Sequence, residues 1–287
     1  MPNLGGPSGR TRRLYAHVAH STALYGAPIW ADKIGADRRS LAVLRRVQRR
    51  MAIRVTRGYR TVSHAAATLL AGMPPIDLIA RAYTDAYKRI AELKAQGVPI
   101  TGRARRLINL EARREARGEW EVRLADPDCP GQRTISAILP CMEAWLERSW
   151  ARASFRTTQV LTGHGCFGEY LCRIGREPNP ACHHCEGDLD TAQHTLGVCP
   201  AWDEQRQALR DRIGADLSLP AVVGAIVERE DAWEAFANYC ERVMRAKEKA
   251  ERVRRGENVP PGAQDRGGGG PRRGRRRRGI AAHRRPW

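Results

Sequence analysis

The sequence predicts a mainly α-helical protein that carries a small knuckle of cysteine and histidine residues and ends in a disordered tail. Three observations predict this fold class. Apolar residues recur at spacings of three and four, with little of the alternation that marks strands. Three cysteines and a histidine cluster within residues 182–199, and the last 32 residues are dominated by Arg, Gly and Pro. The elements follow in chain order.

Charge is the first property that points to a partner. The 287 residues include 50 Lys and Arg against 31 Asp and Glu, a formal net charge of +19. Residues 251–287 contain 12 arginines and three acidic residues, so residues 1–250 are basic in their own right. Basic side chains that neutralise phosphates release condensed counterions, so the excess predicts a polyanionic partner. A charge that only prevents aggregation is the alternative.

The sequence predicts an intracellular protein with no membrane partner. No apolar run approaches the roughly 18 residues that a membrane span needs, and the longest covers only residues 219–227. The N-terminal residues 1–13 contain Gly, Pro and Arg but no apolar signal-peptide core. Three of the eight cysteines cluster with a histidine, which favours a reducing compartment over a disulfide framework.

The first helix that the spacing defines covers about residues 37–57. One apolar stripe follows its length, formed by Leu41, Leu44, Val47, Met51 and Val55. Most of the arginines fall off this stripe, namely Arg45, Arg46, Arg49, Arg50, Arg54 and Arg57. We therefore expect a helix that buries one face and presents a row of guanidinium groups on the other.

Capping residues define the next two helices. Ser63 suits the N-cap of a short helix over residues 64–71, and Gly72 can end it in the left-handed conformation. Pro75 suits the first position of the following helix, because its fixed φ is already helical. Gly97 ends that helix. The two helices should therefore be joined by a tight turn.

The remaining chain divides into a charged linker, a knuckle region and a tail. Residues 103–125 predict a helix of alternating Arg and Glu that bridges solvent or docks over part of its length. Further helices are expected around Trp145 and Trp150 and over residues 154–162, 166–174, 202–213 and 231–255. With a boundary near 127–131, the predicted units are a helical bundle (1–100), a charged helical linker (101–150), a knuckle region with C-terminal helices (151–255) and a disordered basic tail (256–287).

The cysteine cluster has the spacing of a structural zinc site. Cys182, Cys185, His194 and Cys199 form the pattern C-x2-C-x8-H-x4-C. The two-residue gap lets both thiolates point into one turn, and a short helix from about residue 191 would bring the last two ligands round. Three thiolates and one imidazole leave no open position, so we expect one structural Zn²⁺. A redox pair, a disulfide or unligated core cysteines are the alternatives.

The neighbouring histidines and cysteines are predicted to lie outside this set. His183 and His184 sit in the knuckle turn, where they are expected to face solvent or nucleic acid, although His184 could compete with His194. Cys166 and Cys172 lie six residues apart on a helical stretch and are expected in the core.

No catalytic set accompanies the predicted zinc site. Two-metal nucleotidyl transfer needs clustered carboxylates on rigid strands, and the sequence offers none. Neither a phosphate-binding loop of the type G-x-x-x-x-G-K-S/T nor a G-x-S-x-G elbow is present. A zinc enzyme would need an exchangeable water, which a four-ligand set excludes. We therefore expect a binding protein with no catalytic residues, not an enzyme.

Several short segments resemble one known family. They are residues 1–7 (MPNLGGP), 24–30 (LYGAPIW), 44–50 (LRRVQRR), 59–63 (YRTVS), 72–75 (GMPP) and 155–167 (FRTTQVLTGHGCF). In this order, leading into the cysteine cluster, they resemble the C-terminal part of reverse transcriptases from non-LTR (LINE-type) retrotransposons of insects, in the jockey/I-like group. The resemblance covers roughly residues 1–200.

The resemblance implies a nuclear role in target-primed reverse transcription. Residues 1–95 would be the end of the polymerase and its helical thumb, which grips the template–primer duplex. Residues 150–200 would be the linker and CCHC knuckle that position element RNA or target DNA. The catalytic palm, with its aspartates, would lie upstream of Met1, so this chain alone is not expected to polymerise, and that upstream domain is an expected partner.

Seven side chains are the predicted contacts to RNA or DNA. They are Arg45, Arg46, Arg49 and Arg50 on the arginine-rich helix and Arg156, His164 and Arg173 near the knuckle. A solvated helix face is the alternative for each arginine. Phosphate contacts should make binding independent of base sequence and sensitive to salt. A zinc-stapled adaptor that binds protein, or an element relic without selected function, are the alternative interpretations of the whole chain.

Overall fold

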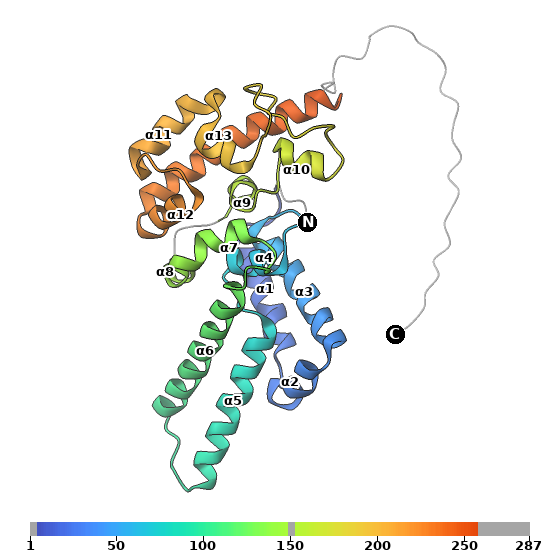
Figure 1. Ribbon diagram of the computed structural model, residues 1–287. Coiled ribbons are helices and arrows are strands. Elements are labelled where there is room, and N and C mark those ends of the chain that lie inside the picture. The colour runs from blue at the N-terminus through green and yellow to red at the C-terminus, as the bar shows by residue number, and fades with distance from the viewer. Residues whose placement is uncertain (1–4, 149–152, 258–287) are drawn as a thin grey trace, which may run out of the picture.

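The structure, a computed structural model, describes residues 5–148 and 153–257, and in these ranges every regular element is helical (Figure 1). The mainly α prediction is therefore confirmed. Trp150 and most of the predicted tail lie outside the described residues. The N-terminal elements are α1 (Gly9–Ala23), α2 (Ala27–Ala36), α3 (Arg38–Thr56), α4 (His64–Ala71), α5 (Ile76–Ala95) and α6 (Gly102–Leu124).

The second half of the chain consists of shorter helices closed by one long helix. In order they are α7 (Gln132–Ile138), the 3₁₀ turn η1 (Leu139–Cys141), α8 (Met142–Glu147), α9 (Phe155–Thr162), α10 (Gly168–Arg173), the π-helical turn η2 (His194–Val198), the 3₁₀ turn η3 (Pro200–Trp202), α11 (Asp203–Ile213), α12 (Leu219–Glu228) and α13 (Glu230–Arg254). Helices α5 and α6 form a long hairpin that projects from the rest, with α4 and α7 between it and the C-terminal helices (Figure 1).

Local capping signals place several helix ends where the sequence predicts them. The Ser63 hydroxyl accepts a hydrogen bond from the Ala66 N–H, and Gly72 adopts a φ of 62° at the end of α4. Ser154 and Thr157 form a capping box at the start of α9. Pro75 stands at the N-cap of α5, one position before its predicted place.

The buried face of α3 includes Val55 of the predicted apolar stripe, with Leu44 and Met51 partly buried, but it is turned away from Val47. Val47 is 46% exposed, whereas Gln48 and Ala52 are fully buried. The Gln48 amide donates to the Pro74 carbonyl at 2.7 Å and its oxygen accepts from the Ile76 N–H at 3.0 Å. A polar side chain thus fastens α3 to the α4–α5 turn, which a count of apolar residues cannot detect.

The charged helix α6 docks over only part of its length. Its buried side chains lie between the middle of the helix and its C-terminal end and are Ala112, Ala116, Trp120 and Leu124. Leu107 and Leu110 remain mostly exposed. The small alanines allow close approach to α5, so the hairpin packs tightly despite few large apolar residues.

The largest core crosses the predicted boundary near residues 127–131. It includes Leu69 and Trp120 on one side and Phe167, Val222 and Phe236 on the other. Two smaller clusters lie among α1–α5. No helix in the described ranges combines the length and the apolar composition that crossing a bilayer requires.

Candidate metal centre and nucleic-acid interface

The turn that carries the first two cysteines is shaped by backbone contacts. The Cys182 N–H donates to the Gly187 carbonyl at 2.7 Å, which closes the knuckle turn. Glu186 adopts the left-handed conformation, with φ at 59°, between those partners. The Asp190 N–H donates to the Pro180 carbonyl at 2.8 Å, so the strand-like segments before and after the turn lie side by side. Cys182 and Cys185 consequently point in the same direction.

The structure brings all four predicted metal ligands together. The ligand atoms of Cys182, Cys185, His194 and Cys199 lie within 4.8 Å of one another. The Cys182 and Cys199 sulfurs are 3.9 Å apart, and Cys185 Sγ lies 3.2 Å from His194 Nε2. A tetrahedral zinc site has edges of about 3.8 Å between sulfurs and about 3.5 Å between sulfur and nitrogen, given its bond lengths. The cluster therefore has the dimensions to hold a metal ion.

Backbone N–H groups point at all three sulfurs. The donors are His184 to Cys182, Gly187 to Cys185 and Ala201 to Cys199. Burial raises the pKa of Cys199 to about 12 and also raises that of Cys182. For Cys185 burial is outweighed by the hydrogen bonds from Gly187 and the two other thiols, so its pKa falls. A divalent cation would ionise all three thiols, and the N–H donors would then stabilise the thiolates.

A buried ion pair anchors the cluster to the last helix. The Lys247 ammonium on α13 lies 2.7 Å from one Asp190 oxygen and 2.9 Å from the other, and both residues are nearly inaccessible. Asp190 also accepts from the Gly168 N–H at 2.9 Å and the Thr195 hydroxyl at 3.0 Å. This carboxylate therefore joins the loop before His194 to α10, to α13 and to the turn that carries His194.

Further side chains of α11 and α13 hold the turn that carries His194 and Cys199. Arg206, 1% exposed, donates to the Leu196 carbonyl at 3.1 Å and to the Cys199 carbonyl. The Tyr239 hydroxyl donates to the Thr195 carbonyl at 2.6 Å. The Thr191 hydroxyl accepts from the His194 N–H at 2.8 Å, which starts the turn near the predicted residue.

Gly168 marks the point where the chain entering the knuckle crosses α10. A Cβ placed there would lie 2.5 Å from the carbonyl oxygens of both Pro180 and Ala181. Those atoms belong to backbone, which cannot move aside cheaply, so no other residue fits at this position. The glycine that opens α10 thus sets the depth at which the knuckle docks.

The two histidines inside the knuckle turn are not among the clustered ligands. The His184 ring packs against Trp202 at a tilt of 55°, with centroids 4.8 Å apart, and His183 Nε2 lies 3.5 Å from Glu177. Cys166 is buried, as predicted, and its thiol contacts Glu251 Oε2 at 3.4 Å, whereas Cys172 is only half-buried.

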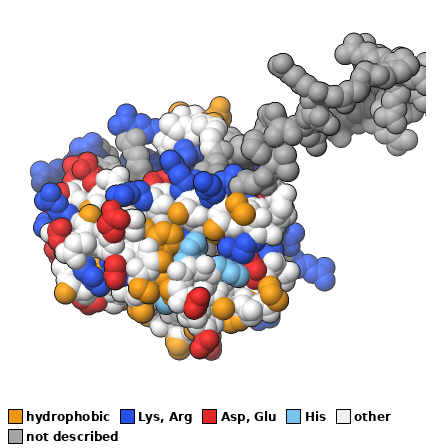
Figure 2. All heavy atoms as spheres, turned by 90° about the horizontal axis from the view of Figure 1, so that it is seen from above, with side chains coloured by type: hydrophobic (Ala, Val, Ile, Leu, Met, Phe, Trp, Pro, Cys, Tyr) orange, Lys and Arg blue, Asp and Glu red, His pale blue; other side chains and the backbone are white. Residues whose placement is uncertain are grey.

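The face that carries α11 and α13 intersperses Lys and Arg with acidic side chains, with histidines near its centre (Figure 2).

Comparison with known proteins gives a consistent group of relatives. A retrovirus-related Pol polyprotein from the type-1 retrotransposable element R1 4 of Nasonia vitripennis is 31% identical over 232 residues, 79% of this chain and 57% of its own length. A putative 115 kDa protein in element R1DM of Drosophila melanogaster is 29% identical over 83% of this chain and 24% of its own length. The chain is homologous to R1-type non-LTR retrotransposon proteins.

The matches also show how much of each relative's length this chain covers. The Pol polyprotein of element R1 from Bradysia coprophila is 26% identical over 71% of this chain and 20% of its own length. The chain spans about half the length of the Nasonia relative and about a quarter or less of the other two. No family model and no solved structure matches it.

Two of the motifs that resemble this retrotransposon family, residues 59–63 and 155–167, meet at one joint between the two halves. Tyr59 packs its ring against Phe155 and Tyr170, with centroids 5.3 and 5.7 Å away. The Thr61 hydroxyl lies 2.7 Å from the Tyr170 hydroxyl and 2.9 Å from His164 Nδ1. Segments about a hundred residues apart thus form one aromatic and hydrogen-bonded contact.

His164 and Arg173 flank this joint. The His164 ring stacks on Tyr170 with centroids 5.0 Å apart, and the Arg173 guanidinium lies 5.2 Å from the same ring centroid. Burial, with Arg173 and Arg49 nearby, lowers the pKa of His164 to about 4. His164 is consequently neutral at physiological pH and could meet a phosphate only as a hydrogen-bond donor, whereas Arg173 is exposed and charged.

The predicted α3 contacts differ in their surroundings. Arg46 and Arg50 are exposed and form no ion pair within the described residues. Arg49 donates to the carbonyls of Val62, at 2.7 Å, and Arg60, so its charge meets no carboxylate. Arg45 pairs with Asp77 at 3.0 Å. Three of the four guanidinium groups therefore keep an uncompensated charge.

Arg156 has a structural role that the sequence does not reveal. Its side chain is 11% exposed and pairs with Glu241 and Glu248 on α13, each at 2.7 Å. These carboxylates occupy the guanidinium, so we do not include Arg156 in the proposed interface. The partners lie 85 and 92 residues along the chain, beyond the reach of a local pattern.

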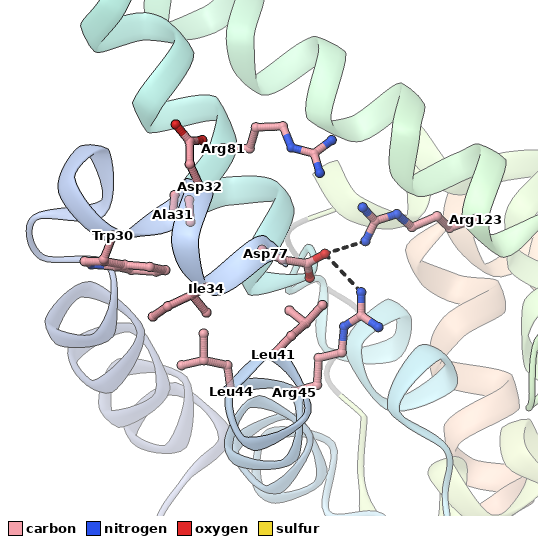
Figure 3. Close-up of a pocket in the computed structure, with 12 residues that line it drawn as sticks. Trp30, Ala31, Asp32, Ile34, Leu41, Leu44, Arg45, Asp77, Arg81 and Arg123 are labelled. Atoms are coloured by element: carbon pink, nitrogen blue, oxygen red, sulfur yellow. Dashed lines mark hydrogen bonds and ion pairs between the residues drawn. The ribbon is translucent and has the colours of Figure 1, made fainter. Parts of the chain in front are cut away.

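A cavity of about 340 Å³ adjoins Arg45 between α2, α3, α5 and α6 (Figure 3). Asp77 Oδ2 accepts from Arg45 and, at 2.6 Å, from Arg123. Burial raises the pKa of Asp77, but the hydrogen bonds from Arg123 and Arg45 outweigh it, so the pKa lies below its ordinary value. This carboxylate therefore holds Arg45 at the edge of the α3 surface.

Sequence reasoning missed Asp190, Lys247 and Arg206, which position the metal cluster. Lys247 and Arg206 lie on helices with charged surfaces, where a basic residue ordinarily faces solvent. Of the three, only Asp190 could be linked to the cluster from the local sequence, since it stands four residues before a predicted ligand in a short loop. Lys247 lies 57 residues away from it in the chain, which hides the pairing.

Proposed function

We propose that this chain is a nucleic-acid-binding region of an R1-type retrotransposon protein, which holds template–primer, target DNA or element RNA during target-primed reverse transcription. The observation that carries the proposal is an open groove along α3. Four arginines line it, namely Arg38, Arg45, Arg46 and Arg49, together with His64, Gly35, Leu41 and Ala42. No acidic residue lines this groove in the described part of the chain.

The α3 groove suits the phosphate backbone of a duplex. Arg38, Arg45 and Arg49 are seven and four residues apart on one helix, about two turns and one turn, so they form a row along one face with Arg46 beside it. Arg38 and Arg46 have no carboxylate partner in the described ranges, and Arg49 donates only to carbonyl oxygens. Phosphate contacts carry no base information, so binding through this row of arginines should be largely independent of base sequence.

We further propose that the cysteine–histidine cluster holds one zinc ion. Cys182, Cys185, His194 and Cys199 would occupy all four positions of a tetrahedron, so the ion would serve structure and leave no site for a substrate water. Zinc supplies a rigid cross-link between the knuckle turn and η2. The network of Asp190, Lys247 and Arg206 would transmit that rigidity to α11 and α13.

The proposed function also implies a location in the cell and further partners. A chain that holds target DNA acts in the nucleus, and its R1 homologues are named as Pol polyproteins. We propose that polymerase chemistry comes from a palm domain outside this chain, and that this region contributes binding alone. That domain and RNA or DNA are then its partners.

The test is a salt titration of duplex and single-stranded RNA and DNA binding by the purified, zinc-analysed chain. Each phosphate that the α3 row neutralises should contribute about 0.9 to the slope of log affinity against log salt. The variant Arg38→Gln/Arg46→Gln/Arg50→Gln should flatten the duplex slope by about two to three. The matched control is Arg242→Gln/Arg245→Gln/Lys249→Gln, which removes the same charge from exposed positions on α13.

The two variants separate a binding surface from a general charge effect. A duplex slope that falls only in the α3 variant supports the proposal. Equal losses in both variants would show attraction by net charge alone. Duplex binding that is weak, insensitive to salt and unchanged in either variant would exclude a nucleic-acid role for α3.

A further inference from the structure

A second groove lies on another side of the N-terminal helices. It encloses about 1210 Å³ between α1, the start of α2 and the α5–α6 hairpin. It shares no lining residue with the α3 groove. Its lining combines aromatic and basic side chains, and among the described residues that line it none is acidic. The proposed function leaves this surface without a role.

Three tyrosines face this groove. Tyr25 is 88% exposed and Tyr87 is 62% exposed, so the fold gains little apolar burial from either ring. Tyr83 and Tyr87 stand four residues apart on α5, which places both on one face of that helix. Rings presented in this way offer flat surfaces on which unpaired bases can stack.

Basic side chains of α6 border the same rings. Arg105, Arg106 and Arg113 line the groove and form no ion pair within the described residues. The Arg113 guanidinium lies 5.8 Å from the Tyr83 ring centroid, with Nη2 3.5 Å from the hydroxyl. Positive charge and aromatic surface therefore alternate along the groove.

We propose that this groove binds a single strand of nucleic acid, with Tyr25 and Tyr87 stacking on bases and Arg105, Arg106 and Arg113 neutralising phosphates. The inference extends the proposed function to a second surface and rests on its assignment of nucleic acid as the partner. A duplex hides its base faces in the stack, so aromatic rings add affinity only for an unpaired strand. The α3 groove, which lacks aromatic residues, has the opposite preference.

The test measures anisotropy of a labelled 20-nucleotide oligo(dT), an oligo(U) of equal length and a DNA duplex with the full chain. Replacement of a stacking ring by alanine should weaken single-strand binding about fivefold or more for each tyrosine. Tyr25→Ala/Tyr87→Ala should therefore lose at least about 25-fold, whereas Tyr25→Phe/Tyr87→Phe, which keeps both rings, should stay within about twofold. Duplex affinity should be unchanged in both variants.

The charge component is tested on the same strands. Arg105→Gln/Arg106→Gln should flatten the salt slope for single strands by about one to two, with the duplex slope unchanged. Because all the substituted side chains are exposed, the variants should melt like the parent chain in circular dichroism. Melting curves therefore serve as the folding control.

Two results would overturn the inference while the proposed function stands. One is single-strand affinity that is equal in the alanine and parent proteins, or equally weak with alanine and phenylalanine. The other is polyglutamate that displaces oligo(dT) with the same dependence on the tyrosines, which would identify an acidic peptide as the occupant. Failure of the proposed function gives a different result. In that case the variant Arg38→Gln/Arg46→Gln/Arg50→Gln binds the duplex as the parent chain does.

Discussion

Helices α1–α5 and the helices around the cysteine cluster, α9–α13, are held together by different interactions. Among α1–α5 the two smaller clusters are built mostly from alanine, with Leu24, Ile53, Val55 and Ile76 as larger members. Around α9–α13 the core contains large rings such as Phe167, Trp202 and Phe236. That second region also contains the buried Lys247–Asp190 pair and the clustered cysteines.

The difference shows how each region serves its proposed role. Alanine-rich packing brings helices close while leaving their long basic side chains on the surface, so α3 and α6 can present arginines in rows. The region around the cysteine cluster also directs charged residues inward: Arg156, Arg206 and Lys247 all contact protein groups. In the proposed function, recognition is therefore assigned to the N-terminal helices and rigidity to the C-terminal ones.

Removal of the metal ligands should break the C-terminal region and produce the largest effect. We expect Cys182→Ser/Cys185→Ser to reduce zinc from one ion per chain to nearly none. Structural zinc contributes about 10–16 kcal/mol in small zinc-finger peptides, so the segment from Glu177 to Trp202 should lose its folded state. Hydrogen exchange should rise there and in α10, while α5 and α6 stay protected.

Cys172→Ser is the control, because Cys172 is half-buried and is not among the clustered ligands. It should keep one zinc per chain and parental exchange rates. Full metal content in the double variant would show that the ion binds elsewhere. Loss of metal without faster exchange would show that the network around Asp190 holds the knuckle unaided.

Gln48→Leu should break the N-terminal region by a smaller amount. The change leaves the Ile76 N–H and the Pro74 carbonyl without their buried partner, and His64 loses its contact to Gln48 Oε1 at 3.0 Å. Each buried group left unpaired costs about 1–3 kcal/mol, so urea denaturation should show a loss of about 2–4 kcal/mol in the free energy of unfolding.

The neighbouring exposed residue supplies the control for this substitution. Val47→Gln should alter the free energy of unfolding by no more than about 0.5 kcal/mol. Zinc content should be unchanged in both variants, since neither residue contacts the cluster. A Gln48→Leu protein as stable as the parent would mean that water replaces the lost hydrogen bonds.

Acidification should weaken the joint between the regions by the smallest amount. The unfolded imidazole of His164 takes up a proton near pH 6.5, whereas the pKa of the folded residue is about 4. The stabilising contribution is thus complete above pH 6.5 and is lost as the pH falls toward 4. Since the ring is partly exposed, we expect a loss of about 1 kcal/mol at pH 5.

His164→Gln should remove this part of the pH dependence. The measurement is the difference in the free energy of unfolding between pH 7.5 and pH 5, compared for the parent and the variant. The parent should lose more than the variant over this interval. Parallel curves would show that His164 is protonated equally in the folded and unfolded chains.

Local signals were sufficient for much of the fold and for the ligand set. Ser63, Gly72 and Ser154 act through neighbours within a few residues, so their caps can be predicted from adjacent letters. The same holds for Cys182 and Cys185, because a two-residue gap fixes the turn.

Features that depend on distant partners could not be predicted. Gln48 is polar and stands on a charged helix, so periodicity assigns it to solvent, yet its acceptors and donors come from the α4–α5 turn. Arg156 is predicted to contact nucleic acid as a basic residue near the knuckle. Its carboxylate partners, Glu241 and Glu248, are supplied by a helix that only the tertiary fold brings near.

Asp190 links occupancy of the cysteine–histidine cluster to the docking of α13. It lies between the second and third metal ligands and binds Lys247, so occupancy of the cluster and docking of α13 favour the same arrangement of one short loop. Such linkage is reciprocal: whatever the bound ion adds to helix docking, the docked helix adds to ion affinity. The chelator concentration needed to remove the ion would then depend on whether α13 is docked. A partner that displaced this helix would lower the affinity of the cluster for the ion.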